Sequence, residues 1–189
     1  MIPHLRFEDV ACDRGGRRLF EAMSFELQPG EAMRLTGPNG AGKSSMLLVA
    51  AGLIEPSAGT VVSRELALAD DRLALDRNMP LRNALGFWAR LDGRSEALDE
   101  AMDALGLSAL ADVPVAYLST GQKRRAGLAR LAASGASLWL LDEPADGLDT
   151  MSRDRLEALL SAHRARGGAV LAASHQPLSG EWRSLELGG

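Results

Sequence analysis

Residues 35–45 of the chain read Leu35-Thr36-Gly37-Pro38-Asn39-Gly40-Ala41-Gly42-Lys43-Ser44-Ser45. The spacing fits G-x-x-x-x-G-K-[ST], the pattern of a loop that binds the phosphates of a nucleoside triphosphate. Its glycines let the backbone fold into a concave nest whose N–H groups point at phosphate oxygens. Lys43 is expected to reach the β- and γ-phosphates, and Ser44 to offer its hydroxyl to Mg²⁺. We therefore predict that the nucleotide contacts the whole stretch from Gly37 to Ser45.

The flanking sequence supplies the strand–loop–helix context that this motif requires. Residues 32–36 can form a strand. Residues 45–51 are typical of a helix whose N-terminal dipole faces the phosphates. The alternative is a glycine-rich turn that matches by chance, and both the number of defined positions and their context argue against it.

Size and composition indicate one compact domain over residues 1–189. The chain is 46% apolar and 24% charged, with a net charge of −4, so nothing points to a nucleic-acid partner. The single cysteine, Cys12, excludes an internal disulfide, and we expect it to be a small, half-buried residue. No apolar run approaches the roughly 20 residues that span a bilayer, and the first residues lack an apolar signal segment. Any role at a membrane would therefore be that of a cytoplasmic, peripheral subunit.

The order of predicted elements indicates an α/β fold with a P-loop NTPase core. Buried parallel strands are expected at 136–141 and 169–174, separated by an amphipathic helix at 151–166. An antiparallel β element precedes the phosphate loop, and an α-helical subdomain is inserted at about 80–133. The remaining expected segments are strands at 5–10, 19–27, 61–63 and 65–69, a turn at 14–17, a loop at 70–79, and a possible edge strand at 181–187.

Two carboxylates follow the buried strand that begins near residue 136. Asp142 can hold Mg²⁺ through water, and Glu143 lies where a general base for the attacking water is needed. Acidic pairs at strand ends are common, so this signal is weak alone and strong together with the phosphate loop.

A second anion site is predicted at Leu118-Ser119-Thr120-Gly121-Gln122. Ser119 and Gln122 have the spacing of a capping box, which a well-capped helix would explain by itself. Gly121 in the first turn costs helix stability, however, and this suggests that the backbone there is left open for a ligand. A helix N-terminus beside a serine hydroxyl suits an anion.

With these motifs the chain resembles the nucleotide-binding subunits of ABC transporters. The resemblance implies the ABC type of P-loop fold, ATPase activity, and ATP with Mg²⁺ as cofactors. It also implies a head-to-tail dimer, in which ATP lies between the phosphate loop of one copy and the signature segment of the other. Ser119, Gly121 and Gln122 would then bind the ATP held by a second copy.

The resemblance assigns roles to two further residues. Asp146-Gly147-Leu148-Asp149 matches the D-loop, with Asp149 at the dimer seam, although a helix N-cap is a compatible interpretation. His175 follows a buried strand, as the switch histidine of the family does, and would contact the γ-phosphate and help to polarise the water. The expected catalytic residues are thus Lys43, Glu143 and His175.

Two groups expected from the family are missing. Arg14 occupies the position of the aromatic residue that stacks on adenine, so we expect Arg14 to stack instead, with weaker base selectivity. The segment from Asp70 to Met79 contains no glutamine to contact Mg²⁺ and couple to a membrane subunit. Asp70 or Asp71 could supply the oxygen. We expect slow intrinsic hydrolysis that depends strongly on a partner.

Longer stretches are similar to the CcmA family, the ATP-binding subunits of the cytochrome c maturation system. They are residues 118–131, 138–144 and 174–178, together with Cys12-Asp13-Arg14 and Phe87-Trp88. This resemblance implies a membrane subunit, CcmB, in a complex with CcmC and CcmD at the cytoplasmic face of the inner (plasma) membrane. Hydrolysis would drive haem export or the release of the haem-loaded chaperone CcmE. We expect no haem on this chain, because its three histidines are scattered and it has no Cys-x-x-Cys-His.

Alternative functions stay open at this point. The catalytic motifs equally suit an ABC exporter of a lipid, drug or peptide, because the membrane subunit selects the substrate. A soluble ABC-type factor acting on ribosomes or DNA is a more remote alternative. A catalytically silent binding module is disfavoured by the joint presence of Lys43, Asp142, Glu143 and His175. Phe87 and Trp88 could dock a partner or simply pack within the helical subdomain.

Overall fold

The computed structural model describes residues 2–188 and contains two β-sheets. The antiparallel sheet has the order β2-β1-β4, and its strands are β1 (Leu5–Arg14), β2 (Arg17–Leu27) and β4 (Ala58–Ser63). The parallel sheet has the order β5-β6-β7-β3-β8, and its strands are β3 (Ala32–Thr36), β5 (Leu66–Ala69), β6 (Leu138–Asp142), β7 (Ala169–Ala173) and β8 (Arg183–Glu186). The predicted antiparallel element, parallel core and edge strand are all confirmed.

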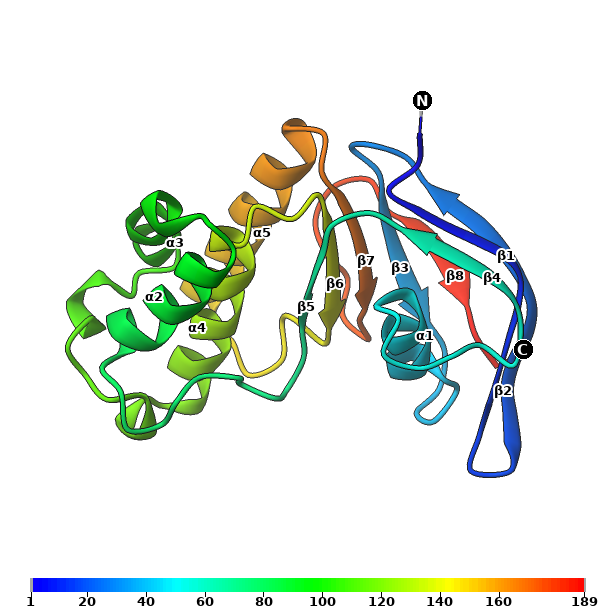
Figure 1. The fold of residues 1–189 in the computed structure, drawn as a ribbon, viewed down its shortest axis with the longest axis horizontal. Helices are drawn as coiled ribbons and strands as arrows, with labels where there is room; N and C mark the ends of the chain where they lie inside the picture. Colours follow the sequence, from blue (N-terminus) through cyan, green and yellow to red (C-terminus); the bar gives the residue numbers. More distant parts are fainter. Residues whose placement is uncertain (1, 189) are drawn as a thin grey trace.

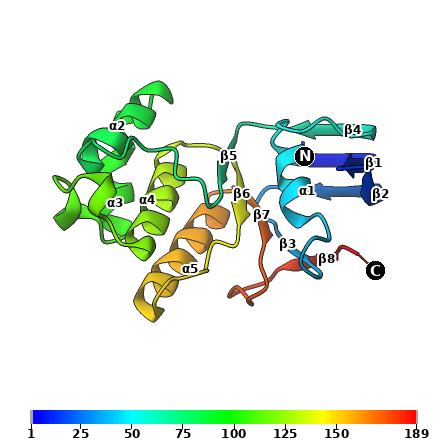
Figure 2. The same cartoon turned by 90° about the horizontal axis from the view of Figure 1, so that it is seen from below.

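The helices form layers on both faces of the parallel sheet. Helix α1 (Lys43–Ala50) lies between the two sheets, and α5 (Thr150–Ala165) covers the opposite face of the parallel sheet (Figures 1 and 2). Beyond α5 lie α2 (Leu81–Leu91), α3 (Leu98–Ala104) and α4 (Thr120–Ala133), joined through the short 3-10 turns Ser95–Ala97, Ser108–Leu110 and Val115–Tyr117. This is the predicted inserted helical part. Within residues 2–188, no helix is long and apolar enough to cross a membrane.

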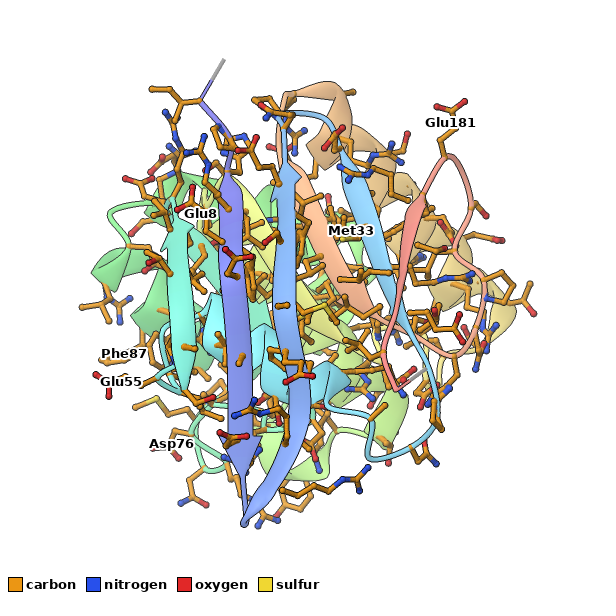
Figure 3. All side chains as sticks on the ribbon, turned by 90° about the vertical axis from the view of Figure 1, so that its right-hand side faces the viewer. Glu8, Met33, Glu55, Asp76, Phe87 and Glu181 are labelled. Atoms are coloured by element: carbon orange, nitrogen blue, oxygen red, sulfur yellow. The ribbon has the colours of Figure 1, made fainter. Side chains whose placement is uncertain are left out.

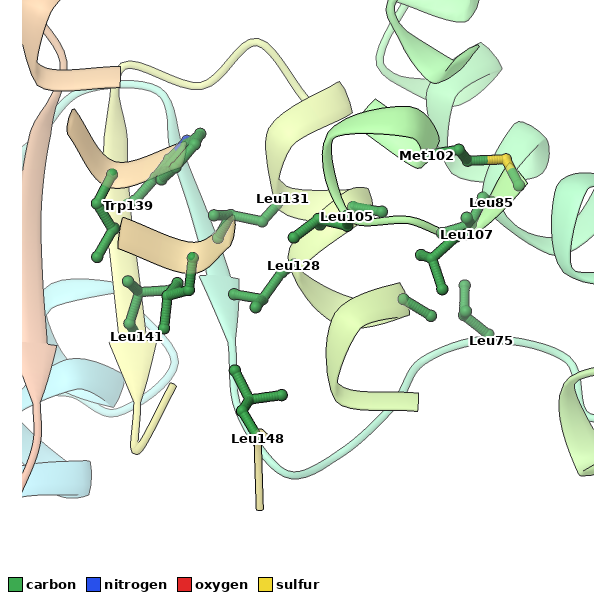
Figure 4. Packing of buried hydrophobic residues seen from close by; sticks show 14 of the residues in the cluster. Leu75, Leu85, Met102, Leu105, Leu107, Leu128, Leu131, Trp139, Leu141 and Leu148 are labelled. Atoms are coloured by element: carbon green, nitrogen blue, oxygen red, sulfur yellow. The ribbon is translucent and has the colours of Figure 1, made fainter. Parts of the chain in front are cut away.

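Strand β6 is apolar at its first four positions because both faces of the sheet are covered there. Leu138 and Leu140 pack into the cluster around α1, whereas Trp139 and Leu141 face the cluster formed with α4 and α5 (Figure 4). A strand buried on both faces shows a continuous apolar run instead of alternation. Burial of this strand fixes its carboxyl end, where Asp142 is the last residue and Glu143 follows.

The first two strands are longer than the alternating pattern predicted. Figure 3 shows their sheet with β1 between β4 and β2. The register between β1 and β2 shifts after Phe7, and Asp9 and Ala22 adopt positive φ angles of 49° and 51°. Such bulges change which face successive side chains occupy, so the alternation ends although the strand continues. Cys12, expected to be half-buried, is completely buried in this sheet.

His163 on α5 stacks on Trp139, with ring centroids 3.7 Å apart and an interplanar angle of 9°. Its Nε2 lies 3.4 Å from the carbonyl oxygen of Ala169, to which it donates. Burial lowers the pKa of His163 to about 4, and the nearby Arg166 and His4 act in the same direction. The imidazole is therefore neutral in the folded protein at neutral pH.

We expect acidification from pH 7 towards pH 5 to lower the free energy of unfolding. The unfolded chain binds a proton at this histidine near its ordinary pKa of about 6.5, whereas the folded chain does so only near a pKa of about 4, so stability is lost as the pH falls through this window. The variant His163→Phe keeps a stacked ring and removes the titration. Urea-unfolding midpoints measured across this range should fall less steeply for His163→Phe than for wild type or for His175→Gln. Parallel slopes would contradict this interpretation.

Candidate nucleotide site

The phosphate loop joins the end of β3 to the start of α1, as the motif predicts. Gly37, Gly40 and Gly42 have φ angles of 130°, 78° and 103°, a region that residues with a side chain rarely adopt. Gly37 also has no room for a Cβ, because the backbone carbonyl of Leu187 occupies that space. The helix begins at Lys43, two residues earlier than predicted. Glycine is thus required here for both conformation and close packing.

Gly37→Ala is expected to destabilise the fold more than Gly40→Ala. Both substitutions force a side chain into a positive-φ position, which costs about 1–3 kcal/mol. Only the Cβ at residue 37 collides with Leu187, because no heavy atom lies within 4 Å of a Cβ at residue 40. The difference between the two urea-unfolding free energies isolates this collision. Equal destabilisation would show that the backbone at Leu187, just after β8, adjusts without cost.

Lys43 is almost completely buried at the base of the loop, with 7% of its surface exposed. Its Nζ donates hydrogen bonds to the carbonyl oxygens of Gly37 at 2.9 Å and Pro38 at 3.0 Å. These acceptors hold the ammonium group beside the nest, where a point charge attracts phosphate.

A cleft of about 580 Å³ opens above this loop. Most of the predicted nucleotide-contacting and catalytic residues line it together. They are Arg14, Asn39, Gly40, Gly42, Lys43, Ser44, Ser45, Asp142, Glu143 and His175. Gly37, Pro38 and Ala41 do not line the cleft; Ala41 is buried, and the carbonyls of the other two bind Lys43.

Glu143 and His175 meet at the carboxyl end of the parallel sheet because they follow neighbouring strands, β6 and β7. The backbone N–H of His175 donates to Oε2 of Glu143 at 3.2 Å, and Nε2 of His175 lies 3.5 Å from Oε1. The backbone N–H of Glu143 donates to the carbonyl of Ala173 at 2.9 Å. Glu143 has a φ angle of 45°, a strained backbone of the kind that clusters at functional sites. Its carboxylate is thus held in a fixed position, and 22% of the Glu143 side chain stays exposed.

The signature residues lie outside this cleft. Ser119 caps α4: its Oγ accepts from the N–H of Gln122 at 3.2 Å, and Oε1 of Gln122 accepts from the N–H of Ser119 at 2.8 Å. The predicted capping box is confirmed. A Cβ at Gly121 would have only ordinary contact with the carbonyl of Gly147, so this side of the helix start faces the D-loop. The structure therefore brings the signature to the D-loop and not to the phosphate loop of the same chain.

Asp149 caps α5, which confirms the N-cap interpretation of that residue. Its Oδ1 accepts from the backbone N–H of Ser152 at 2.8 Å. Hydrogen bonds from Ser152 hold the pKa of Asp149 below its ordinary value, so this cap is ionised at neutral pH. Asp149 does not line the cleft of its own chain.

Arg14 lines the cleft, and its stacking on adenine stays a prediction. Its Nη1 donates to Oγ of Ser45 at 3.3 Å, in the first turn of α1. Beside it, Leu19 contributes an aliphatic side chain to the wall of the cleft. Sequence reasoning missed Leu19, although its place in the strand after Gly15-Gly16 was a usable signal.

Asp146 is a second residue that the sequence did not single out for this cleft. Its carboxylate lines the cleft from the D-loop and accepts from Nε2 of Gln176 at 3.3 Å. Asp146 also borders a smaller hollow of about 220 Å³, which Asp70, Asp71 and Asp142 share. The segment without a glutamine therefore does reach the neighbourhood of Asp142.

Comparison with known proteins defines the class. The profile of the ABC transporter family matches residues 20–146. The fold is similar to an ABC transporter ATP-binding protein from Pyrococcus furiosus, with a TM-score of 0.84, 20% identity, and coverage of 97% of this chain and 96% of that one. It is also similar to the ATP-binding subunit of an ABC transporter, with a TM-score of 0.82, 25% identity, and coverage of 90% and 79%. The chain belongs to the ABC transporter family, and it is an ATPase of the ABC type.

Within that family the chain groups with proteins named cytochrome c biogenesis ATP-binding export protein CcmA. The protein from Sphingopyxis alaskensis is 55% identical over 177 residues, covering 93% of this chain and 91% of that protein. The protein from Novosphingobium aromaticivorans is 56% identical over 174 residues, covering 90% and 88%. The protein from Zymomonas mobilis is 50% identical over 185 residues, covering 97% and 84%.

Proposed function

We propose that the chain is the ATP-hydrolysing subunit of a membrane complex for cytochrome c maturation, and that it couples hydrolysis to haem export or to release of the haem-loaded chaperone CcmE. The observation that carries the ATPase part is the convergence of Lys43, Ser44, Glu143 and His175 on one cleft. The part concerning cytochrome c is supported by the similarity to CcmA proteins over most of the chain.

In the proposed mechanism, Glu143 is the general base. A carboxylate that accepts one hydrogen bond from the backbone N–H of His175 keeps its other oxygen free to accept a proton from the attacking water. The His175 ring, next to that oxygen, contacts the γ-phosphate. Lys43 places its positive charge at the β- and γ-phosphates, where negative charge develops.

The residues of the cleft fit Mg²⁺. Ser44 and Asp142 both line it, and hydroxyl and carboxylate oxygens are ligands that Mg²⁺ prefers. In the part of the chain that the structure describes, no three His, Cys, Asp or Glu side chains gather into a metal cluster. This fits an ion that takes most of its ligands from phosphate and water. We infer that Ser44 holds it directly and Asp142 through water, and that the bound ion neutralises phosphate charge.

The signature segment and the D-loop are proposed to act on a second copy. Ser119, Gly121, Gln122 and Asp149 do not line the cleft of their own chain. A capped helix start with a glycine in its first turn is suited to a phosphate. A head-to-tail dimer would bring this helix start to the ATP that the other copy holds on its phosphate loop.

We further infer that residues 1–189 form one ATP-binding domain, which binds the membrane subunit CcmB, with CcmC and CcmD, peripherally at the cytoplasmic face of the inner membrane. Exposed apolar side chains of the helical part support a partner there. Phe87 is 51%, Leu91 68% and Tyr117 81% exposed. Trp88, by contrast, packs under Arg130, whose guanidinium lies 3.7 Å from its ring, so only Phe87 of this pair is free for docking.

Haem binding by this chain itself is not proposed. Ring nitrogens of two of the three histidines already have backbone partners: Nε2 of His4 donates to the carbonyl of Gly167 at 2.9 Å, and Nε2 of His163 donates to Ala169. His175 belongs to the nucleotide cleft. The haem-handling step is therefore assigned to the membrane partners.

The proposal is tested by affinity capture. Tagged Glu143→Gln chain is recovered from solubilised membranes in the presence of ATP, and its partners are identified by mass spectrometry, with tagged Lys43→Met as the matched control. CcmB-like and CcmC-like proteins are the expected partners. Recovery of an unrelated permease would leave the ATPase assignment in place but contradict the role in cytochrome c maturation. Soluble ribosomal or DNA-bound partners alone would overturn the membrane role.

A further inference from the structure

Asp146 connects three segments that carry functional residues. Its carboxylate accepts from Nε2 of Gln176, at 3.3 Å. Its backbone N–H donates to the carbonyl of Glu143 at 3.1 Å. Its backbone carbonyl lies 3.5 Å from Nε of Arg124, on the helix that Ser119 caps. One exposed residue thus contacts the base segment, the switch segment and the signature helix.

Gln176 is itself firmly placed. Its carbonyl accepts from Oγ of Ser174 at 2.9 Å and from Nη1 of Arg34 at 3.4 Å, and its N–H donates to the same Ser174 hydroxyl at 3.2 Å. Arg34 lies on β3, in the strand layer below the cleft. The backbone after β7 is therefore anchored, and the amide side chain of Gln176 extends from this anchor to the D-loop.

We propose that Asp146 and Gln176 are positioning residues for ATP hydrolysis. Their hydrogen bond holds the segment that carries Glu143 against the segment that carries His175, and so fixes the distance between base and switch histidine. The contact of Arg124 with Asp146 extends this arrangement to the signature helix. The inference rests on the catalytic roles proposed above for Glu143 and His175.

The chemical groups of Asp146 and Gln176 determine the direction of their hydrogen bond. A carboxylate only accepts hydrogen bonds, whereas a primary amide can donate. Gln176→Glu would place two carboxylates side by side and push the two segments apart. Asp146→Asn retains an acceptor in its amide oxygen. In the combined variant Asp146→Asn/Gln176→Glu, the Asn amide donates to the Glu carboxylate, so the same hydrogen bond forms in the reverse direction.

The test is steady-state ATP hydrolysis by the purified full chain, with kcat and KM determined separately. Gln176→Glu and Asp146→Ala should each lower kcat about fivefold to tenfold with little change in KM, the range expected for one hydrogen bond in the transition state. Asp146→Asn should stay within about twofold of wild type, and Asp146→Asn/Gln176→Glu should recover to within about threefold. Asp154→Asn, an exposed carboxylate on α5, is the control.

Wild-type kcat in Gln176→Glu, or no recovery in the combined variant, would overturn the inference. Equal rises in KM and losses of thermal stability in all variants would also overturn it, because they would indicate a purely structural role. Glu143→Gln is measured in parallel. If that variant loses turnover while the Asp146 and Gln176 variants do not, only this inference fails; if Glu143→Gln keeps turnover, the proposed site itself fails.

Discussion

Glu143→Gln is expected to lose ATP hydrolysis by about 10²- to 10⁴-fold while it still binds ATP. The amide has the shape of the carboxylate, and its oxygen can still accept the hydrogen bond from the N–H of His175. It cannot take a proton from water, so only the chemical step is removed. Phosphate release under single-turnover conditions measures the loss, and nucleotide titration measures the binding that is retained.

A second readout follows from the same variant. If ATP lies between two copies, blocked hydrolysis should trap an ATP-bound dimer, visible by analytical ultracentrifugation and absent without ATP. Asp154→Asn serves as the control for removal of a carboxylate. Unchanged turnover in Glu143→Gln would show that Glu143 is not the base.

Lys43→Met is expected to weaken ATP binding about tenfold to hundredfold, because a hydrogen bond to a charged group contributes about 1.5–3 kcal/mol. Hydrolysis should fall further, since the lost charge also serves the transition state. Methionine keeps an unbranched stem in this nearly buried position. ATP affinity by isothermal titration calorimetry is the measurement.

The control for this substitution is Arg64→Ala, which removes an exposed cation just after β4, at the antiparallel sheet. Its ATP affinity should match wild type. Wild-type affinity in Lys43→Met would mean that phosphate binding here depends on backbone N–H groups alone. A melting temperature close to wild type would confirm that the fold survives the loss of the hydrogen bonds to Gly37 and Pro38.

The core of the site was predictable because its chemistry is encoded in local spacing. The glycines of residues 37–42 and the following Lys43 predict a phosphate-binding nest beside a positive charge. The structure places this loop at a strand–helix junction. Strand β6 was equally predictable from the sequence, since burial on both faces requires an uninterrupted apolar run before Asp142.

The parts that escaped prediction depend on contacts between distant segments. Asp146 and Gln176 are 30 residues apart, and the sequence around neither residue predicts their hydrogen bond. The position of Arg14 before Gly15 predicted that it contacts the nucleotide. Its hydrogen bond with Ser45 was not predictable, because it depends on how the β1–β2 turn folds over α1. The extent of β1 was missed because the bulge at Asp9 ends the alternation without ending the strand.

The central claim is that each ATP is hydrolysed between the phosphate loop of one copy and the signature segment of another. It can be tested because these two elements lie apart within one chain and can be inactivated separately. Two inactive variants are mixed in equal amounts. Lys43→Met lacks the phosphate-loop cation, and Gly121→Asp places a carboxylate at the signature, where a Cβ makes only ordinary contact with the carbonyl of Gly147. Only a mixed dimer contains one intact composite site.

The measurement is ATP hydrolysis by this mixture at constant total protein concentration. Random pairing makes half of the dimers mixed, each with one working site of two, so about a quarter of wild-type activity should return. Exchange of subunits is demonstrated separately, by co-purification of the untagged variant with the tagged one. Recovery in the mixture is the predicted result. A mixture as inactive as its two components, with exchange demonstrated, would contradict a site shared between two copies.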